Sequence, residues 1–139
     1  MNDLLNARRI LEEEGCTCVL CLGEAFVTSH RRGVAPLLEL LESGRRFAGW
    51  SAADKVVGKA TAMLYRLLGV KTVWAKVISE SALTALQQGG IEAQWEQRVP
   101  HIVNRAGDGR CPMETATAHT NDPHEALAAI QTALKKLQG

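Results

Sequence analysis

The stretch VKTVWAKVISESALTALQQGGIEAQWEQRV, residues 70–99, decides the fold class of this chain. Its first part, residues 70–78, is rich in β-branched and apolar residues and predicts a buried strand. Residues 79–88 predict a helix that ends at two glycines, and residues 91–99 predict a second strand. Strands that alternate with helices in this way pair in parallel through the crossover helix, so we expect an α/β fold.

The residues upstream predict a β-hairpin and three helices. CTCVLCL and AFVTSH have the composition of two strands, and Gly23 and Glu24 form the short connection that a hairpin needs. The helices are expected at residues 1–14, 36–43 and 52–68, each followed by a glycine. The third of these would be the central helix of the chain.

The end of the chain predicts a last short strand, a loop and a strong helix. HIVN, residues 101–104, is the candidate strand, and RAGDGRCP follows as the loop. In the final helix Asp122 should be the N-cap, Pro123 the first helical residue and Glu125 the acid of a capping box. We therefore expect one domain over residues 1–139, a three-layer α/β/α sandwich with a mixed sheet of four to five strands.

The composition excludes several classes of partner. The 139 residues carry a formal net charge of +1 and only three Trp, two Phe and one Tyr, which disfavours a nucleic-acid surface. No apolar run approaches the roughly 20 residues that span a bilayer. The N-terminal residues are charged and do not resemble a signal peptide. We expect a cytoplasmic protein with no nucleic-acid or membrane partner and with reduced cysteines.

Three cysteines, Cys16, Cys18 and Cys21, form a C-x-C-x-x-C pattern that could suggest zinc. On a strand, Cys16 and Cys18 should point to one face and Cys21 to the other, so the three thiolates cannot surround one ion. Cysteine is also among the residues most often buried. We therefore expect core thiols, no metal site and no cofactor.

The expected central helix holds the first candidate site. Its apolar stripe leaves Lys55, Lys59 and Arg66 on the opposite side, where they would be a solvated face. Ser51 and Asp54 fit a variant capping box, which is a structural role. Alternatively, this helix N-terminus, with Lys55 beside it, receives an anionic ligand.

Two further places could contribute to a site. Ser79 and Glu80 follow a buried strand, where ligands bind in open α/β sheets, although they could equally be an N-cap and a first-turn acid. Cys111 lies in a loop beside an arginine, so it is either a nucleophile or a structural thiol. Arg31 and Arg32 could hold an anion or could simply be solvated charges.

Several segments together resemble a known family. RGVAPLLELLESG, DKVVGKATAMLYRLLGV, VISESAL, VPHIVNR and CPME followed by DPHEAL are similar to an uncharacterised prokaryotic domain-of-unknown-function family with a cytidine-deaminase-like fold. The resemblance implies the same mixed α/β/α sandwich. Deaminase-like folds commonly self-associate, so Trp50, Trp74 and Trp95 are candidates for a homo-oligomer interface or for the core.

Zinc-dependent deaminases carry H-x-E and P-C-x-x-C at two helix starts. Here the corresponding positions read SAADK and ISESA, without His or Cys, so zinc-dependent deamination is not expected. What the resemblance then implies is a deaminase-shaped pocket that lacks zinc ligands. Asp54, Lys55 and Cys111 are the candidate catalytic residues, and the candidate ligand-binding residues are Ser51, Ser79, Glu80 and Asn104.

We expect a protein that binds or acts on a small anionic, nucleotide-like metabolite. Lys55 would neutralise the anion, and Asp54 or Glu80 would transfer a proton. The alternative is a non-catalytic module that senses a ligand or assembles as an oligomeric scaffold. The sequence leaves open whether the protein is an enzyme, and it names neither the substrate nor the reaction.

Overall fold

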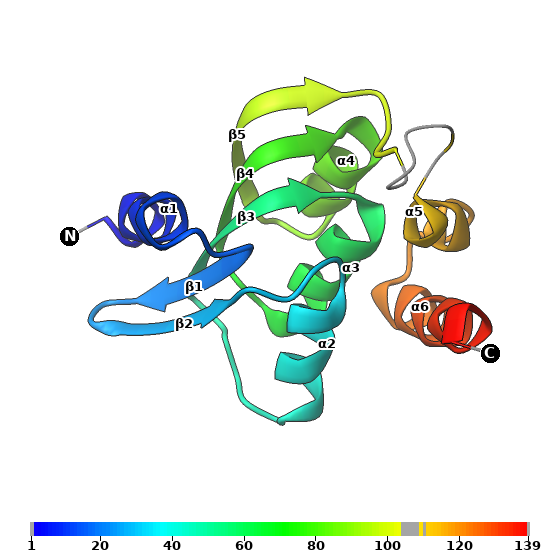
Figure 1. Ribbon diagram of the computed structural model, residues 1–139, viewed down its shortest axis with the longest axis horizontal. Helices are drawn as coiled ribbons and strands as arrows, with labels where there is room; N and C mark the ends of the chain where they lie inside the picture. The colour runs from blue at the N-terminus through cyan, green and yellow to red at the C-terminus, as the bar shows by residue number, and fades with distance from the viewer. Residues whose placement is uncertain (1, 104–108, 110, 139) are drawn as a thin grey trace.

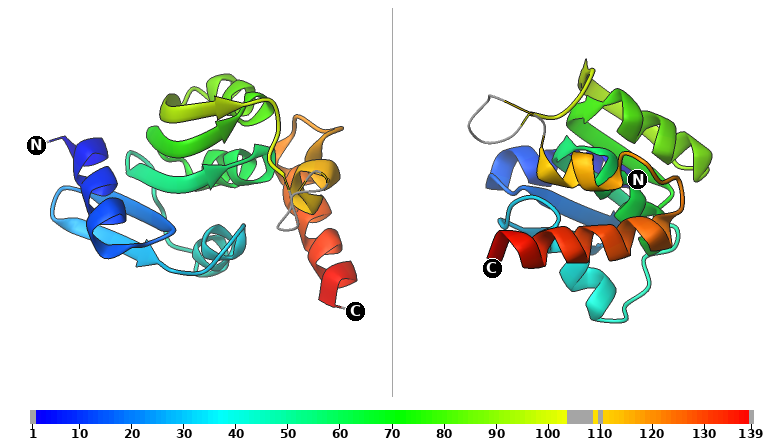
Figure 2. Two further views of the ribbon diagram at one scale, coloured as in Figure 1. Left: turned by 45° about the horizontal axis from the view of Figure 1, so that its top comes forward. Right: turned by 90° about the vertical axis from the view of Figure 1, so that its right-hand side faces the viewer.

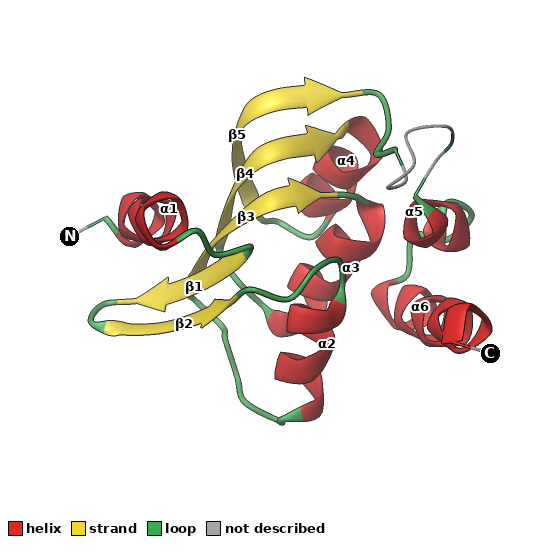
Figure 3. Ribbon diagram, viewed as in Figure 1, coloured by secondary structure: helices red, strands yellow, loops and turns green. Residues whose placement is uncertain are grey.

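The computed structural model describes residues 2–103, 109 and 111–138. Its helices and strands appear in Figure 1 and, coloured by type, in Figure 3. In chain order they are α1 (Asp3–Glu14), β1 (Cys18–Leu22), β2 (Ala25–Ser29), α2 (Ala35–Glu42), β3 (Ser51–Val57), α3 (Lys59–Leu68), β4 (Thr72–Ser79), α4 (Glu80–Gln88), β5 (Glu92–Val99), α5 (Pro112–Thr117) and α6 (Pro123–Gln138).

The strands form one mixed five-stranded sheet in the order β2-β1-β3-β4-β5. β1 pairs antiparallel with both β2 and β3, so the predicted hairpin is confirmed. β3, β4 and β5 are parallel, and α3 and α4 are the crossovers between them. The parallel pairing that the sequence predicted for residues 70–99 is therefore confirmed, as is the mixed α/β sheet.

The predicted central helix over residues 52–68 is wrong in its first half. Residues 51–57 form the central strand β3, and only Lys59–Leu68 is helical. Gly58 separates the two with an extended backbone, φ −94° and ψ 179°. A central strand buries side chains on both faces, so SAADKVV lacks the strict alternation that identifies a half-buried strand.

Helices cover both faces of the sheet, which makes the arrangement three-layered. α1 lies alone on one face, where it packs against β1, β3 and β4. α2, α3 and α4 cover the other face, as Figure 1 shows. α5 and α6 lie side by side and pack outside α3, as both views in Figure 2 show. This leaves the carboxyl ends of the parallel strands close to α5.

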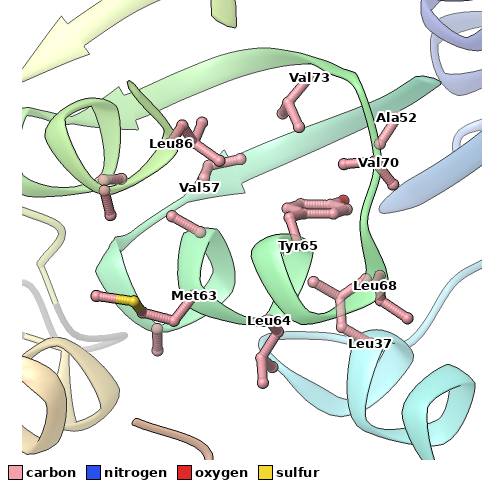
Figure 4. Packing of buried hydrophobic residues seen from close by; sticks show 14 of the residues in the cluster. Leu37, Ala52, Val57, Met63, Leu64, Tyr65, Leu68, Val70, Val73 and Leu86 are labelled. Atoms are coloured by element: carbon pink, nitrogen blue, oxygen red, sulfur yellow. The ribbon is translucent and has the colours of Figure 1, made fainter. Parts of the chain in front are cut away.

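The larger core lies between the sheet and α3. Met63, Leu64 and Tyr65 are fully buried there, and Figure 4 shows Tyr65 directed from α3 toward the strands. Truncating a buried Leu or Met in such a core costs about 2–5 kcal/mol of unfolding free energy. The packing therefore holds α3, and with it the strand–helix junction at Gly58, in one position.

The three strand-region cysteines are buried, which confirms their prediction as core thiols. Their predicted faces are wrong, however. Cys16 precedes the strand and shares the α1-side cluster with Cys21, whereas Cys18 points into the opposite core. Within the described part of the chain, no group of three His, Cys, Asp or Glu side chains gathers as a metal site would require.

The C-terminal part differs from the expectation in three details. The candidate strand at residues 101–104 is not formed over its described residues, 101–103. The sequence did not predict α5, which begins at Pro112. Asp122 Oδ1 caps α6 as predicted by accepting hydrogen bonds from the N–H groups of His124 and Glu125. Glu125 does not close the capping box on Asp122, because the Asp122 N–H donates to the Thr120 hydroxyl, which in turn donates to the Glu125 carboxylate. No described helix has both the length and the apolar character needed to cross a bilayer.

Candidate functional site

Asp54 lies on β3 and points toward α3, where its carboxyl group is buried. The Tyr65 hydroxyl donates a hydrogen bond to Asp54 Oδ2 at 2.7 Å, and the Val56 N–H donates to Oδ1 at 3.3 Å. Behind them, Cys18 Sγ lies 3.3 Å from the Tyr65 hydroxyl oxygen. Asp54, Tyr65 and Cys18 thus form a buried polar cluster between β1, β3 and α3.

The electrostatics of this cluster favour the protonated form of each member. Burial raises the pKa of Asp54 to about 7, even though hydrogen bonds from Tyr65 and from the backbone lower it. Burial likewise raises the pKa values of Cys18 and Tyr65 well above their usual ranges, and the charge of Asp54 adds to both increases. Asp54 can therefore both donate and accept a proton near neutral pH, which is what a general acid–base group requires.

A cavity of about 470 Å³ opens beside Asp54, and we call it the inner cavity. Its walls are the carboxyl end of β3, the first turn of α3, residues 31–36 and residues 102–114 as far as these are described. Its lining includes two thiols, Cys18 and Cys111, and five charged residues: Arg31, Arg32, Asp54, Lys55 and Glu114. Cavities of roughly 300–1,000 Å³ are typical of small-molecule sites.

Glu114 of α5 joins the starts of two helices beside this cavity. Its Oε1 accepts hydrogen bonds from the Lys59 N–H at 3.0 Å and from the Ser79 hydroxyl at 2.7 Å. Its Oε2 accepts a bond from the Ile102 N–H at 3.3 Å. Lys59 begins α3 and Ser79 is the N-cap of α4, so one buried carboxylate accepts bonds from the first N–H of α3 and the capping hydroxyl of α4.

The candidate residues from the first strand–helix unit are spread over three places. Ser51 lies at the opposite end of β3 from Val57, where its hydroxyl accepts a bond from Thr72, so it is not a helix N-cap. Lys55 is exposed and, as the neighbour of Asp54 on a strand, points to the other face of the sheet, although it contributes to the cavity wall. Of these three residues, only Asp54 belongs to the buried cluster. Ser51 and the side chain of Lys55 lie away from it.

The remaining candidate residues also lie in different places. Ser79 is the N-cap of α4 and binds Glu114, and Glu80 is an exposed first-turn residue. Cys111 lines the inner cavity next to α5. Asn104 lies outside the described residues.

Lys59 was expected to be solvated, and this is wrong. Its side chain is buried, and its Nζ donates a hydrogen bond to the Ala118 carbonyl at 3.1 Å. Burial lowers the pKa of Lys59, and the nearby Glu114 opposes that shift. Lys59 thereby links α3 to the end of α5 and does not face solvent.

The three tryptophans occupy different environments. Trp74 is buried beneath the Arg8 guanidinium, and Trp50 packs edge-on against Phe47. Trp95 lies on the edge strand β5 and is partly exposed. Trp74 is thus a core residue.

Two functional candidates, Tyr65 and Glu114, were not recognised in the sequence. Tyr65 is the only tyrosine in the chain, and it lies on the apolar face of a helix. A tyrosine in that position predicts a buried hydroxyl with a hydrogen-bond partner. Glu114 gave no signal, because its partners lie 35 and 55 residues away in the chain.

Comparison with known proteins places the chain in a family. The model of the TM1506 family, a domain of unknown function (DUF1893), matches residues 6–134. The chain belongs to this family. The crystal structure of a DUF1893 family protein (TM1506) from Thermotoga maritima is similar, with a TM-score of 0.85 and 28% sequence identity over 98% of this chain and 91% of that one. The search of curated proteins gave no match.

Proposed function

We propose that the inner cavity of this DUF1893 protein binds a small anionic metabolite and that Asp54 exchanges a proton with it. The observation that carries the proposal is a buried carboxyl group with a pKa of about 7 that lines a cavity walled by arginines. Perturbed carboxyl groups in cavities are frequent at functional sites. The ligand would lie between Asp54 and Arg32.

Positive charge for the anion would come from the segment before α2 and from a helix terminus. Arg31 and Arg32 are exposed and both line the inner cavity, although Arg31 also pairs with Glu39. Gly58, Ala60 and Thr61 bring the N-terminal end of α3 to the same wall. Oriented N–H groups at a helix start favour an anion. Arg32 replaces Lys55 as the principal cation of the proposed site.

The proton would move through Asp54. In its protonated form Asp54 can donate to a leaving group or to an anionic oxygen, and in its ionised form it can accept a proton. Tyr65 is a positioning residue, because its hydroxyl donates a hydrogen bond to Asp54 Oδ2. The other carboxyl oxygen, Oδ1, accepts a bond from the Val56 N–H. Turnover of the bound metabolite would separate an enzyme from a ligand sensor.

A cytidine-deaminase-like ancestry remains part of the proposal, without deaminase chemistry. The two strand–helix junctions beside the cavity carry Gly58–Lys59 and Ser79–Glu80. None of these residues is the His or Cys ligand that zinc deaminases use. Glu114 instead occupies the space between the two junctions through its hydrogen bonds. We therefore do not assign a metal-activated water to this site.

The test is binding of inorganic sulfate, inorganic phosphate and nucleoside monophosphates, measured by thermal shift and calorimetry. A ligand at about 100 times its Kd should stabilise the fold by about 2.7 kcal/mol. Arg32→Ala should weaken binding at least tenfold. Arg46→Ala, which removes an exposed arginine outside the cavity lining, is the matched control and should bind like the wild type. Equal binding by the wild type and Arg32→Ala would contradict the proposed anion contact.

A further inference from the structure

A second cavity of about 960 Å³ adjoins the inner one, and we call it the outer cavity. It lies between α2, with the segment before it, and the helices α5 and α6. Leu38, Met113, Leu134 and Leu137 provide much of its apolar wall. Two glutamates, Glu39 and Glu42, stand on the α2 side, and Glu39 is paired with Arg31.

The two cavities are neighbours, and together we call them the cleft. They share residues 31–34, Val103, Cys111 and Met113 as a common wall. Arg32 therefore lines both cavities, and the outer one adds the aliphatic side chains of Leu38, Leu134 and Leu137. A ligand held by Arg32 in the inner cavity would therefore lie next to the outer one.

Three of the seven large apolar side chains that are exposed among the described residues line this cleft. Val56 is 44% exposed and lines the inner cavity, Val103 is 55% exposed and lines both, and Leu137 is 64% exposed and lines the outer one. Single exposed apolar residues are ordinary, but several along one concave surface indicate a binding site.

The chemistry of the walls distinguishes an aliphatic ligand from a nucleobase. No Phe, Tyr or Trp is among the described residues that line either cavity. Proteins that hold bases commonly stack them on aromatic side chains. Leucine, valine and methionine side chains instead match a flexible hydrocarbon chain, whose burial is favourable in proportion to its area.

We propose that the ligand is an anionic amphiphile, with its charged head in the inner cavity near Arg32 and Asp54 and its aliphatic chain in the outer cavity. This inference rests on the proposed function of the inner cavity and narrows its ligand class. Each methylene that enters the outer cavity should tighten binding about fourfold.

The experiment uses the full chain and a series of sulfates with constant charge: inorganic sulfate and butyl, hexyl and octyl sulfate, below the concentrations at which they form micelles. Calorimetry should show Kd falling by about tenfold or more for every two methylenes. Leu137→Ser, at an exposed position, and Leu134→Ala, at a half-buried one, should reduce this dependence. Leu5→Ser, which removes a leucine 61% exposed on α1, is the control and should leave it unchanged.

The outcomes separate the two proposals. If inorganic sulfate binds but chain length has no effect, the amphiphile inference is overturned and the anion site stands. Chain-length dependence that survives Leu137→Ser and Leu134→Ala, or tighter binding of nucleoside monophosphates than of octyl sulfate, also overturns it. If neither sulfate nor any alkyl sulfate binds, the proposed function itself fails.

Discussion

A Cβ atom placed on Gly58 would lie 2.9 Å from Glu114 Oε1, which is closer than real side chains approach. The bonds that Glu114 accepts from the Lys59 N–H and the Ser79 hydroxyl therefore depend on the absence of a side chain at the end of β3. Gly58 does not need its freedom of backbone conformation, because its φ of −94° is available to any residue. Its role is to leave space for Glu114.

Gly58→Ala should destabilise the fold by about 1–2 kcal/mol, because Glu114 must move away from the Lys59 N–H and the Ser79 hydroxyl. Chemical denaturation measures the change. In a Glu114→Ala background the obstacle is gone, so the same Gly58→Ala change should cost little. Additive effects of the two substitutions would contradict this coupling.

Tyr65→Phe should raise the pKa of Asp54 further above about 7, because the hydrogen bond from Tyr65 is among the contacts that lower it. An NMR titration of the Asp54 carboxyl carbon measures the shift. Thr61→Val, which alters a residue of the cavity wall that makes no described bond to Asp54, serves as the control. A pKa that stays the same or falls in Tyr65→Phe would contradict the role assigned to Tyr65.

Stability should fall as pH rises from about 4 to about 7. Below pH 3.8, the ordinary pKa of Asp54, the carboxyl is protonated in both the folded and the unfolded state. At higher pH the unfolded chain releases the proton, while the folded protein keeps it until about pH 7. The free energy of unfolding therefore falls by about 4 kcal/mol for a pKa raised from 3.8 to about 7. Urea unfolding at several pH values measures the free energy of unfolding, and Asp54→Asn should lack this pH-dependent contribution. If the free energy of unfolding changes with pH equally in the wild type and in the variant, the prediction is contradicted.

Sulfate affinity should decrease as pH rises through about 7, because sulfate keeps its charge while Asp54 becomes an anion on the cavity wall. Calorimetric titrations at pH 6 and pH 8 measure the difference. Asp54→Asn should bind sulfate with nearly the same affinity at both pH values. A wild-type affinity that is independent of pH would place the bound anion away from Asp54.

The sequence predicted the elements whose patterns are local. Residues 70–99 combine a β-branched run, a helix ended by glycines and a second strand, and the structure has all three in parallel arrangement. Residues 51–57 were mistaken for helix because a strand buried on both faces has no alternation. That error had a direct consequence for the site, since a strand sends Asp54 and Lys55 to opposite faces.

The contacts that define the site depend on long-range packing. Asp54 was a candidate from the sequence, but its bond with the buried Tyr65 depends on how α3 lies on the sheet. An N-cap was one of the two roles that the sequence left open for Ser79, and the structure shows that Ser79 is the N-cap of α4. Its bond to Glu114 could not be predicted, because it joins α4 to a helix 35 residues away in the chain.

The four thiols differ sharply in accessibility. Cys16, Cys18 and Cys21 are enclosed by the sheet and its helices, whereas Cys111 is half-buried on the wall shared by the inner and outer cavities. A thiol-specific fluorophore added to the native protein should therefore attach at one position without any engineered cysteine. The wild-type chain thus provides its own attachment point for a reporter of cleft occupancy.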